Sequence, residues 1–195
     1  MRDALRNAAE HITSMMHEEV RAAESMERDG DKVDGAEAER AFLKYFKAFI
    51  AEVRSARDYM TTAANKTGND VWIRNRFSGM ERELFAFFNA LMNLTLHQYR
   101  PKLEPRSNQI QYVAEPDAVI LRSGIPSKMR VTGLVNAKYH FSLTDLDSKA
   151  EDAFKALEKR YPGETVLMLA IRYRDALVQI LKNAERNNRF DTVST

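Results

Sequence analysis

The fold of this chain is decided by the stretch AFLKYFKAFIAEVRSAR, residues 41–57. Its large apolar side chains recur three and four residues apart, which is the spacing of one face of an α-helix. Gly68 follows in the position of a helix-terminating glycine. The stretch therefore predicts a helix over residues 36–66 with a wide apolar face, begun by Asp34 with Glu37 three residues later, as in a capping box.

Helical spacing recurs on both sides of this stretch and predicts further helices. They are expected at 2–28, at 70–77 as a short helix, at 78–98, at 148–160 and at 164–188, with a polar loop at 29–35. Ser78 and Ser148 each precede a glutamate by three residues, the pattern of the capping boxes that begin helices. Pro101 ends the helix at 78–98, because a proline ring cannot continue a helix.

Residues 101–147 differ in character, because their prolines and glycines exclude a long helix. β-Branched and aromatic residues partly alternate in three short runs, which are 109–113, 118–121 and 131–141. The predicted fold class is therefore mainly α, a helical bundle with a small antiparallel β insertion at about 108–142.

The length of 195 residues suits a single domain, 1–195. Its segments are an acidic N-terminal helix and loop (1–35), the core helices (36–100), the loop and β insertion (101–147) and the C-terminal helices (148–195). Residues 1–39 hold 5 Lys/Arg and 11 Asp/Glu, whereas residues 40–195 hold 25 and 17. This asymmetry has two interpretations: an acidic helix docked on a basic body, or a basic surface that faces nucleic acid.

Several classes of function are excluded or disfavoured by composition. The chain has no cysteine, which excludes disulfides and thiolate metal sites. Its four histidines lack zinc-ligand spacing, and no Gly-rich phosphate loop or Gly-x-Ser-x-Gly motif occurs, so we expect neither a metal nor a cofactor. No apolar run reaches the roughly 20 residues of a membrane span. The N-terminus lacks a signal-peptide pattern, and we expect a cytoplasmic protein without membrane association.

Asn93 and His97 are the most suggestive polar residues. They are four residues apart near the end of the predicted helix 78–98, so their side chains would share one face. A histidine near a helix C-terminus is favoured as the cation and can act as acid or base near neutral pH. The structural alternative is that both side chains bond the last free carbonyl groups of the helix.

The order of these features resembles the HEPN-like helical proteins, which include many ribonucleases of bacterial and phage conflict systems. The aromatic helix at 41–57 and the ending Leu-Met-Asn-x-x-x-His at 91–97 are similar to helices of that family, and the resemblance covers about residues 36–190. It implies a homodimer around the helix that carries the motif. It also implies metal-independent RNA cleavage, with His97 as the acid or base and Asn93 as its orienting partner.

The sequence departs from the family at Met92, which stands where HEPN ribonucleases carry the arginine of an Arg-x(4–6)-His motif. A methionine cannot hold a phosphate, so Arg100, Arg57 or Arg54 would have to replace that arginine in space. Two functions follow. One is an active metal-independent endoribonuclease that uses His97. The other is a degenerate, non-catalytic relative from a toxin–antitoxin or phage-defence system, which binds RNA or a partner protein or serves as a scaffold. The missing arginine favours the second.

Other basic residues are weaker candidates for RNA contacts. Arg74 and Arg76 alternate with aromatic residues, as in segments that stack on RNA, and Lys102 adds a positive charge beyond the predicted helix end. The alternative is partly buried aromatic rings with solvated arginines between them. Arg6 and His11 match Arg-x(4–6)-His literally, but they lie in the acidic N-terminal helix, and a match by coincidence is expected among so many arginines.

Overall fold

The computed structural model describes residues 1–28, 32–79, 81–94, 100–116, 121 and 125–190. Over these ranges the chain forms α1 (Arg2–Arg28), α2 (Lys32–Lys66), α3 (Asp70–Gly79), α4 (Arg82–Asn93), β1 (Arg100–Pro116), β2 (Met129–Thr144), α5 (Ser148–Arg160) and α6 (Val166–Arg186). The predicted class, a mainly α bundle with a small antiparallel β insertion, is confirmed. No helix among these residues is both long and apolar enough to cross a lipid bilayer.

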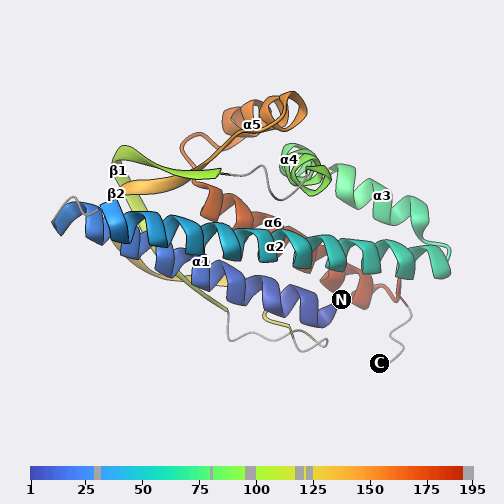
Figure 1. Ribbon diagram of the computed structural model, residues 1–195. Helices are drawn as coiled ribbons and strands as arrows, with labels where there is room; N and C mark the ends of the chain where they lie inside the picture. The colour runs from blue at the N-terminus through green and yellow to red at the C-terminus, as the bar shows by residue number, and fades with distance from the viewer. Residues whose placement is uncertain (29–31, 80, 95–99, 117–120, 122–124, 191–195) are drawn as a thin grey trace.

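Two long antiparallel helices, α1 and α2, pack against each other and are the longest helices of the bundle (Figure 1). The 35 residues of α2 span about 52 Å at 1.5 Å per residue. The face of α1 toward the bundle is narrow and lined by small or flexible side chains, which include Leu5, Ala8, Ala9 and Ile12, all buried. Small side chains let the two helices approach closely, and this one-sided packing explains why an Ala-rich stripe suffices for a helix of this length.

The start of α2 differs from the prediction. Residues 32–35 were expected in a loop, but α2 already begins at Lys32, and Asp34 lies inside its first turn rather than at its cap. Gly35 is buried beside Met26 of α1, so contact between the helices compensates for the low helix propensity of glycine.

The end of α2 is as predicted. Gly68 adopts a positive φ of 69°, which glycine reaches without steric cost. Its N–H donates to the carbonyl of Asn65 at 3.3 Å, and the N–H of Asn69 donates to that of Ala64 at 2.7 Å. These two bonds form a Schellman motif, which turns the chain into α3.

The boundaries of α4 correct two predictions. Ser78 does not cap it, because α3 continues to Gly79 and the Ser78 hydroxyl donates to the Arg74 carbonyl at 2.9 Å. The N-cap residue is Glu81, whose carboxylate accepts a hydrogen bond from the Tyr161 hydroxyl instead of capping the helix. At the other end α4 stops at Asn93, and Leu94 has extended backbone angles (φ −76°, ψ 146°). The predicted helix to residue 98 is therefore too long.

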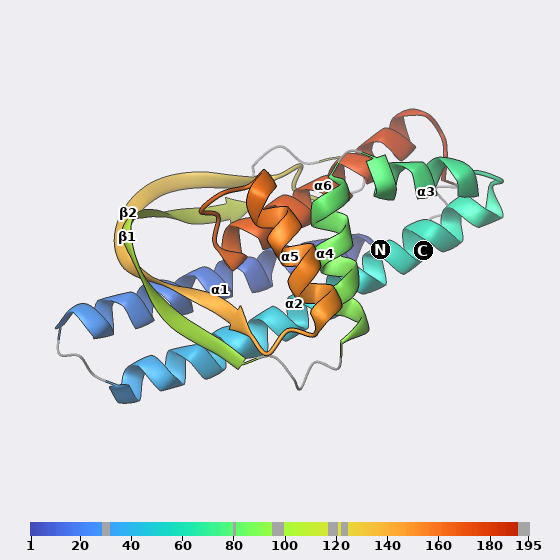
Figure 2. The same ribbon diagram turned by 90° about the horizontal axis from the view of Figure 1, so that it is seen from above.

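The β hairpin is longer than predicted, because β1 starts at Arg100 rather than near 108. The strands pair antiparallel, with Leu103 opposite Phe141 and Pro105 opposite Tyr139. Prolines fit here because each strand of a two-stranded ladder has one open edge, where a missing N–H costs no hydrogen bond. Figure 2 shows the hairpin curving strongly around one end of the helices. Of the run predicted at 118–121, residues 118–120 lie outside the described part, and Leu121 is not in a strand.

The two C-terminal helices lie where the sequence predicted them, with different caps. Asp147, not Ser148, caps α5: its carboxylate accepts from the N–H of Ala150 at 2.7 Å. The Thr165 hydroxyl caps α6 by accepting from the N–H of Met168 at 3.2 Å. The apolar side chains that recur at helical spacing along α6 face inward and are buried, namely Val166, Leu169, Ala170, Tyr173, Leu177, Ile180 and Leu181.

A chain of aromatic rings runs through the core from the hairpin to α3. We call it the aromatic line. Neighbouring ring centroids are 4.2–6.4 Å apart along Phe141, Phe42, Phe46, Phe49, Phe88, Tyr173, Phe85 and Phe77. Each such pair adds about 0.5–1.5 kcal/mol beyond the burial of its surface. The line joins β2, α2, α4, α6 and α3, and so fixes the helices that carry the arginines described next.

Candidate nucleic-acid interface

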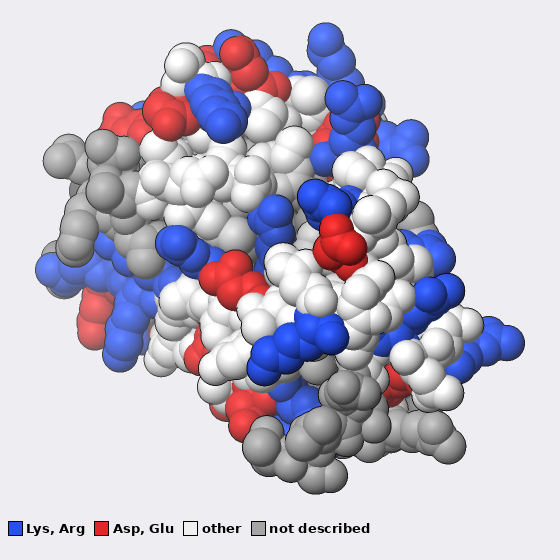
Figure 3. Space-filling view, turned by 90° about the vertical axis from the view of Figure 1, so that its right-hand side faces the viewer, with Lys and Arg blue, Asp and Glu red and all other residues white. Residues whose placement is uncertain are grey.

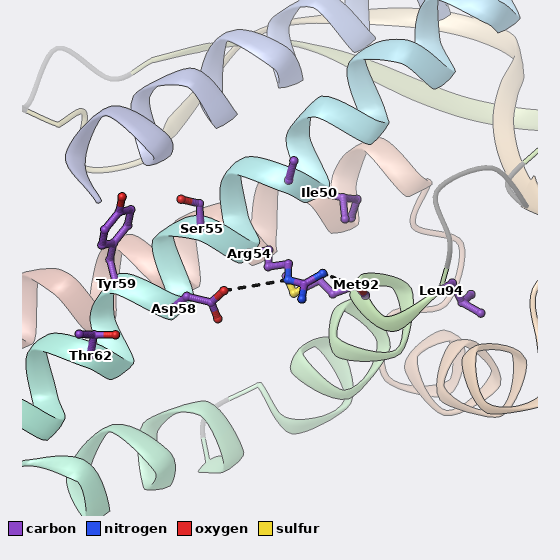
Figure 4. Close-up of a pocket in the computed structure, with 9 residues that line it drawn as sticks. Ile50, Arg54, Ser55, Asp58, Tyr59, Thr62, Met92 and Leu94 are labelled. Carbon is purple, nitrogen blue, oxygen red and sulfur yellow. Dashed lines mark hydrogen bonds and ion pairs between the residues drawn. The ribbon is translucent and has the colours of Figure 1, made fainter.

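The groove at the C-terminal end of α4 contains Met92, the position that decides the family comparison (Figure 4). It has a volume of about 430 Å³ and is lined by Ile50, Ala51, Arg54, Ser55, Asp58, Tyr59, Thr62, Met92 and Leu94. The Arg54 guanidinium donates to the Met92 carbonyl (Nη1···O 3.4 Å), and its Nε lies 4.0 Å from Asp58 Oδ2. Arg54 therefore places a cation at the negative end of the α4 dipole, beside a carboxylate that offsets its charge.

The helix on which Asn93 and His97 were predicted to share a face ends at Asn93. Asn93 is exposed and is the last residue of α4. Because the backbone is already extended at Leu94, no continuous helix runs from Asn93 to the position of the histidine. His97 itself lies outside the described residues.

A second hollow lies beside the N-terminal half of α4 and collects three arginines. Arg57 from α2, Arg74 from α3 and Arg82 from α4 line it. Its volume is about 310 Å³, and the other lining residues are Phe77, Ser78, Phe85, Ala86 and Asn89. We call this site the arginine pocket. No carboxylate is among its described lining residues.

The arginine pocket contains two residues that sequence analysis missed, Arg82 and Asn89. They are seven residues apart on α4, a spacing that places them on the same helical face as Phe85 and Ala86. That spacing was readable from the sequence. However, nothing local indicated that Arg57 and Arg74, distant in sequence, would face the same hollow.

Arg57 is held in place by two interactions. Its Nη1 donates to Asn89 Oδ1 at 2.8 Å, and its Cζ lies 5.1 Å from the centroid of the Phe77 ring. A guanidinium has only donors, so the Asn89 oxygen must face it and the two amide N–H groups point elsewhere. Cation–π stacking adds about 0.5–1 kcal/mol at a partly exposed position. The guanidinium is thus oriented before any ligand arrives.

Arg74 and Arg82 differ in their partners. Arg74 forms an ion pair with Asp70, one turn earlier on α3. Arg82 is exposed, and the described part of the chain offers it no hydrogen-bond or ion-pair partner. The three pocket arginines and Asp70, the carboxylate paired with Arg74, together carry a net charge of +2.

The remaining basic candidates lie elsewhere. Arg76 stacks on Trp72 (Cζ to ring centroid 5.6 Å) and borders a different groove, next to α6. Trp72 is half-buried and packs edge-on against Phe190, with ring centroids 6.0 Å apart. The ring is thus partly buried, and Arg76 is itself half-buried. Lys102 is exposed on β1, and the Arg100 side chain lies outside the described part of the structure.

The literal motif Arg6–His11 lies on α1, away from α3 and α4. Residues five apart are about 140° from each other around a helix, so the two side chains do not share a face. Arg6 lies 3.4 Å from Asp3, and the His11 ring is 6.3 Å from the ring of Tyr45 on α2. These contacts give both residues a structural role and bring no second cation to the histidine.

A deeply buried charged group lies where α1 packs against the hairpin. Glu19 of α1 is 1% exposed, and its Oε1 accepts from the N–H of Phe141 at 2.9 Å. Burial raises the pKa of Glu19 to about 7, and the hydrogen bond from Phe141 only partly opposes this shift. Val20, the apolar neighbour of Glu19 in the sequence, is only half-buried.

A buried ion pair on α6 fixes the residues that lead into β2. The Arg174 guanidinium is fully buried and donates to the carbonyl of Pro126 at 2.8 Å and to Asp175 Oδ1 at 2.9 Å. Asp175 in turn accepts from the N–H of Met129 at 3.1 Å. Burial raises the pKa of Asp175, while the Arg174 charge opposes that rise. This arginine is therefore structural.

Figure 3 shows the charged side chains on the surface at the end of the molecule where α2 passes into α3. On this face Lys and Arg lie in several separate groups, with Asp and Glu between them. Such a surface favours a discrete anion site over a broad non-specific one. Within the described ranges no three His, Cys, Asp or Glu side chains gather as a metal site would require.

No protein-family model matches the chain, and neither the curated proteins nor the solved structures contain a significant match to it.

Proposed function

We propose that this protein binds RNA through the arginine pocket and does not cleave it, as a non-catalytic relative of the HEPN-like ribonucleases. The observation that carries the proposal is the pocket itself: three guanidinium groups from three helices, with no carboxylate among the described lining residues. Arginine binds phosphate with paired N–H donors, and phosphate contacts dominate the affinity of proteins for nucleic acids. We also propose that the protein acts in a bacterial or phage conflict system, and this part of the proposal is supported by the sequence resemblance.

The non-catalytic part of the proposal is supported at the end of α4. Met92 is 7% exposed, so its side chain packs in the core and offers nothing to a phosphate. The helix that would align Asn93 with a following histidine ends at Asn93. Both features differ from what an Arg-x(4–6)-His active site requires.

One contact favours a second candidate, the metal-independent endoribonuclease. The Arg54 guanidinium reaches across from α2 to the Met92 carbonyl, so a cation lies beside the position where the family carries its arginine. In that mechanism Arg54 would stabilise charge on the phosphate, and His97 would move the proton at the 2′-hydroxyl. Asp58, close to Arg54, weakens this candidate because it reduces the positive charge.

Assembly and partners also remain proposals. A homodimer, or a complex with a partner protein, would cover apolar surface. Among the described residues the exposed large hydrophobic side chains are Tyr59 and Val71, which are 56% and 59% exposed. Both lie near the α2–α3 turn, and this is where we place an interface of either kind.

RNA binding is tested by fluorescence anisotropy with a 3′-labelled single-stranded RNA. The double variant Arg57→Gln/Arg82→Gln is expected to bind at least about tenfold more weakly and with a shallower salt dependence, because two phosphate contacts are lost. The charge-matched control is Arg2→Gln/Lys182→Gln, at two exposed residues of α1 and α6 that lie outside the pocket. Equal affinity of the double variant and the control contradicts the proposal.

Cleavage is tested with the same RNA in EDTA. We expect intact RNA with the wild-type protein. Cleavage that His97→Ala and Arg54→Gln both abolish would replace the first candidate by the second.

A further inference from the structure

We propose that the arginine pocket is a phosphomonoester site, which takes the terminal phosphate of an RNA strand rather than an internal phosphodiester. As far as RNA is concerned, this inference rests on the proposed function. It adds the part of the RNA that the pocket recognises.

The number of arginines is the first argument. A phosphodiester within a strand has two free oxygens, whereas a terminal phosphate presents three strong acceptor oxygens. Arg57, Arg74 and Arg82 approach one hollow from three different helices. Each guanidinium can give two parallel N–H bonds. Three guanidinium groups that line one hollow match a group with three acceptors better than a group with two.

Charge is the second argument. The three pocket arginines and Asp70 together carry a net +2, because Asp70 neutralises one of the arginines. A phosphomonoester carries about −1.5 to −2 at pH 7, and an internal diester carries −1. The terminal group therefore matches this charge more closely than an internal diester does.

Preorganisation is the third argument. Arg57 is fixed by Asn89 and by the Phe77 ring, so ordering it costs little when a ligand binds. The Asn89 amide N–H groups have no protein partner in the described part of the chain and add neutral donors. Arg82 is exposed and free to close on a bound phosphate.

The arginine pocket leaves little room for a base to stack on the Phe77 ring. The Phe77 ring is covered on one side by Arg57 and lies 5.5 Å from the Phe85 ring, centroid to centroid. A base cannot replace either contact without displacing part of the core. The pocket is therefore suited to the phosphate end of a nucleotide, and the base would lie outside it.

The test compares two RNA 12-mers of one sequence, both 3′-labelled, one with a 5′-phosphate and one with a 5′-hydroxyl. The wild-type protein is expected to bind the 5′-phosphate form about tenfold more tightly at physiological ionic strength, the worth of one strong charge-assisted contact. Arg82→Gln removes this preference, Arg82→Lys keeps part of it, and Arg2→Gln leaves it unchanged. Circular dichroism verifies that the variants fold.

A second arm uses adenosine monophosphate and adenosine as free ligands in calorimetry. Equal affinity for the two RNA ends overturns the phosphomonoester inference but leaves RNA binding intact. Binding of adenosine monophosphate, lost in Arg82→Gln, without RNA binding supports the inference and overturns the proposed function. Failure to bind either RNA end or the nucleotide overturns both.

Discussion

Charged side chains are buried at one end of the aromatic line and lie at the surface at the other end. At the hairpin end the Glu19 carboxyl is buried against Phe141, and Arg174 is sealed beneath the residues that lead into β2. At the α3 end the Arg57 guanidinium lies over Phe77 at the surface, next to two more arginines. Buried charges lose hydration and need internal partners, so they hold the fold together, whereas exposed clustered charges remain available to a ligand. Residue type alone does not separate these roles.

The largest effect is expected from Arg174→Met. It removes the cation paired with the half-buried Asp175 and the bond to Pro126, so the free energy of unfolding should fall by about 3 kcal/mol. Urea denaturation measures this loss. The control is Arg172→Met, a half-exposed arginine paired with Glu164, which should cost no more than about 1 kcal/mol. Similar losses of unfolding free energy in the two variants would contradict the distinction between buried and exposed charges.

The next effect concerns Glu19 and depends on pH. Its pKa rises from 4.5 in the unfolded chain to about 7 in the folded protein. The folded state therefore holds the Glu19 proton more tightly, and the contribution of Glu19 to stability falls as pH rises from about 4.5 through about 7, then levels off. Glu19→Gln keeps an acceptor for the Phe141 N–H and removes the titration. At pH 8 it should be more stable than wild type, on the order of 2–3 kcal/mol.

Urea denaturation of both proteins at pH 5 and pH 8 tests this prediction. The stability difference between Glu19→Gln and wild type should be larger at pH 8. A difference that does not change with pH would mean that the Glu19 carboxyl is not protonated in the folded core.

Phe77→Leu tests the end of the aromatic line at α3, where Arg57 lies over the Phe77 ring. It removes the ring under Arg57 and the contact with Phe85, at a cost of about 1–2 kcal/mol in stability. Affinity for 5′-phosphorylated RNA should fall several-fold, because Arg57 is no longer held in place. Leu94→Ala, in the other groove, is the control and should not change RNA affinity. Unchanged affinity of Phe77→Leu would show that preorganisation of Arg57 is unimportant.

The smallest effect is expected from Arg54→Gln. The guanidinium at the end of α4 contributes about 0.5 kcal/mol through the helix dipole, and Asp58 loses a weak ion pair. RNA affinity should be unchanged, measured by anisotropy beside Arg82→Gln. A large loss of RNA affinity in Arg54→Gln would move the binding site from the arginine pocket to the groove at Met92.

Much of the fold was predictable because helices leave a local record in the sequence. The spacing around residues 41–57, the glycine at position 68 and the inner face of α6 all predicted what the structure contains. Boundaries were less predictable. The serines with a glutamate three residues later suggested caps at 78 and 148, but Glu81 and Asp147 occupy the N-cap positions. A cap depends on the path of the preceding chain, which the local pattern does not contain.

The sequence by itself determined a cysteine-free helical bundle with one β insertion, and it named Arg57 and Arg74 as candidate phosphate contacts. Only the tertiary structure decided that these two arginines meet Arg82 in one pocket, while Arg54 and Arg76 border separate grooves. The physical reason is the difference in range between the two kinds of information. Helical periodicity is set by neighbours within a few residues, whereas the meeting of three cations depends on how α2, α3 and α4 pack around the aromatic line.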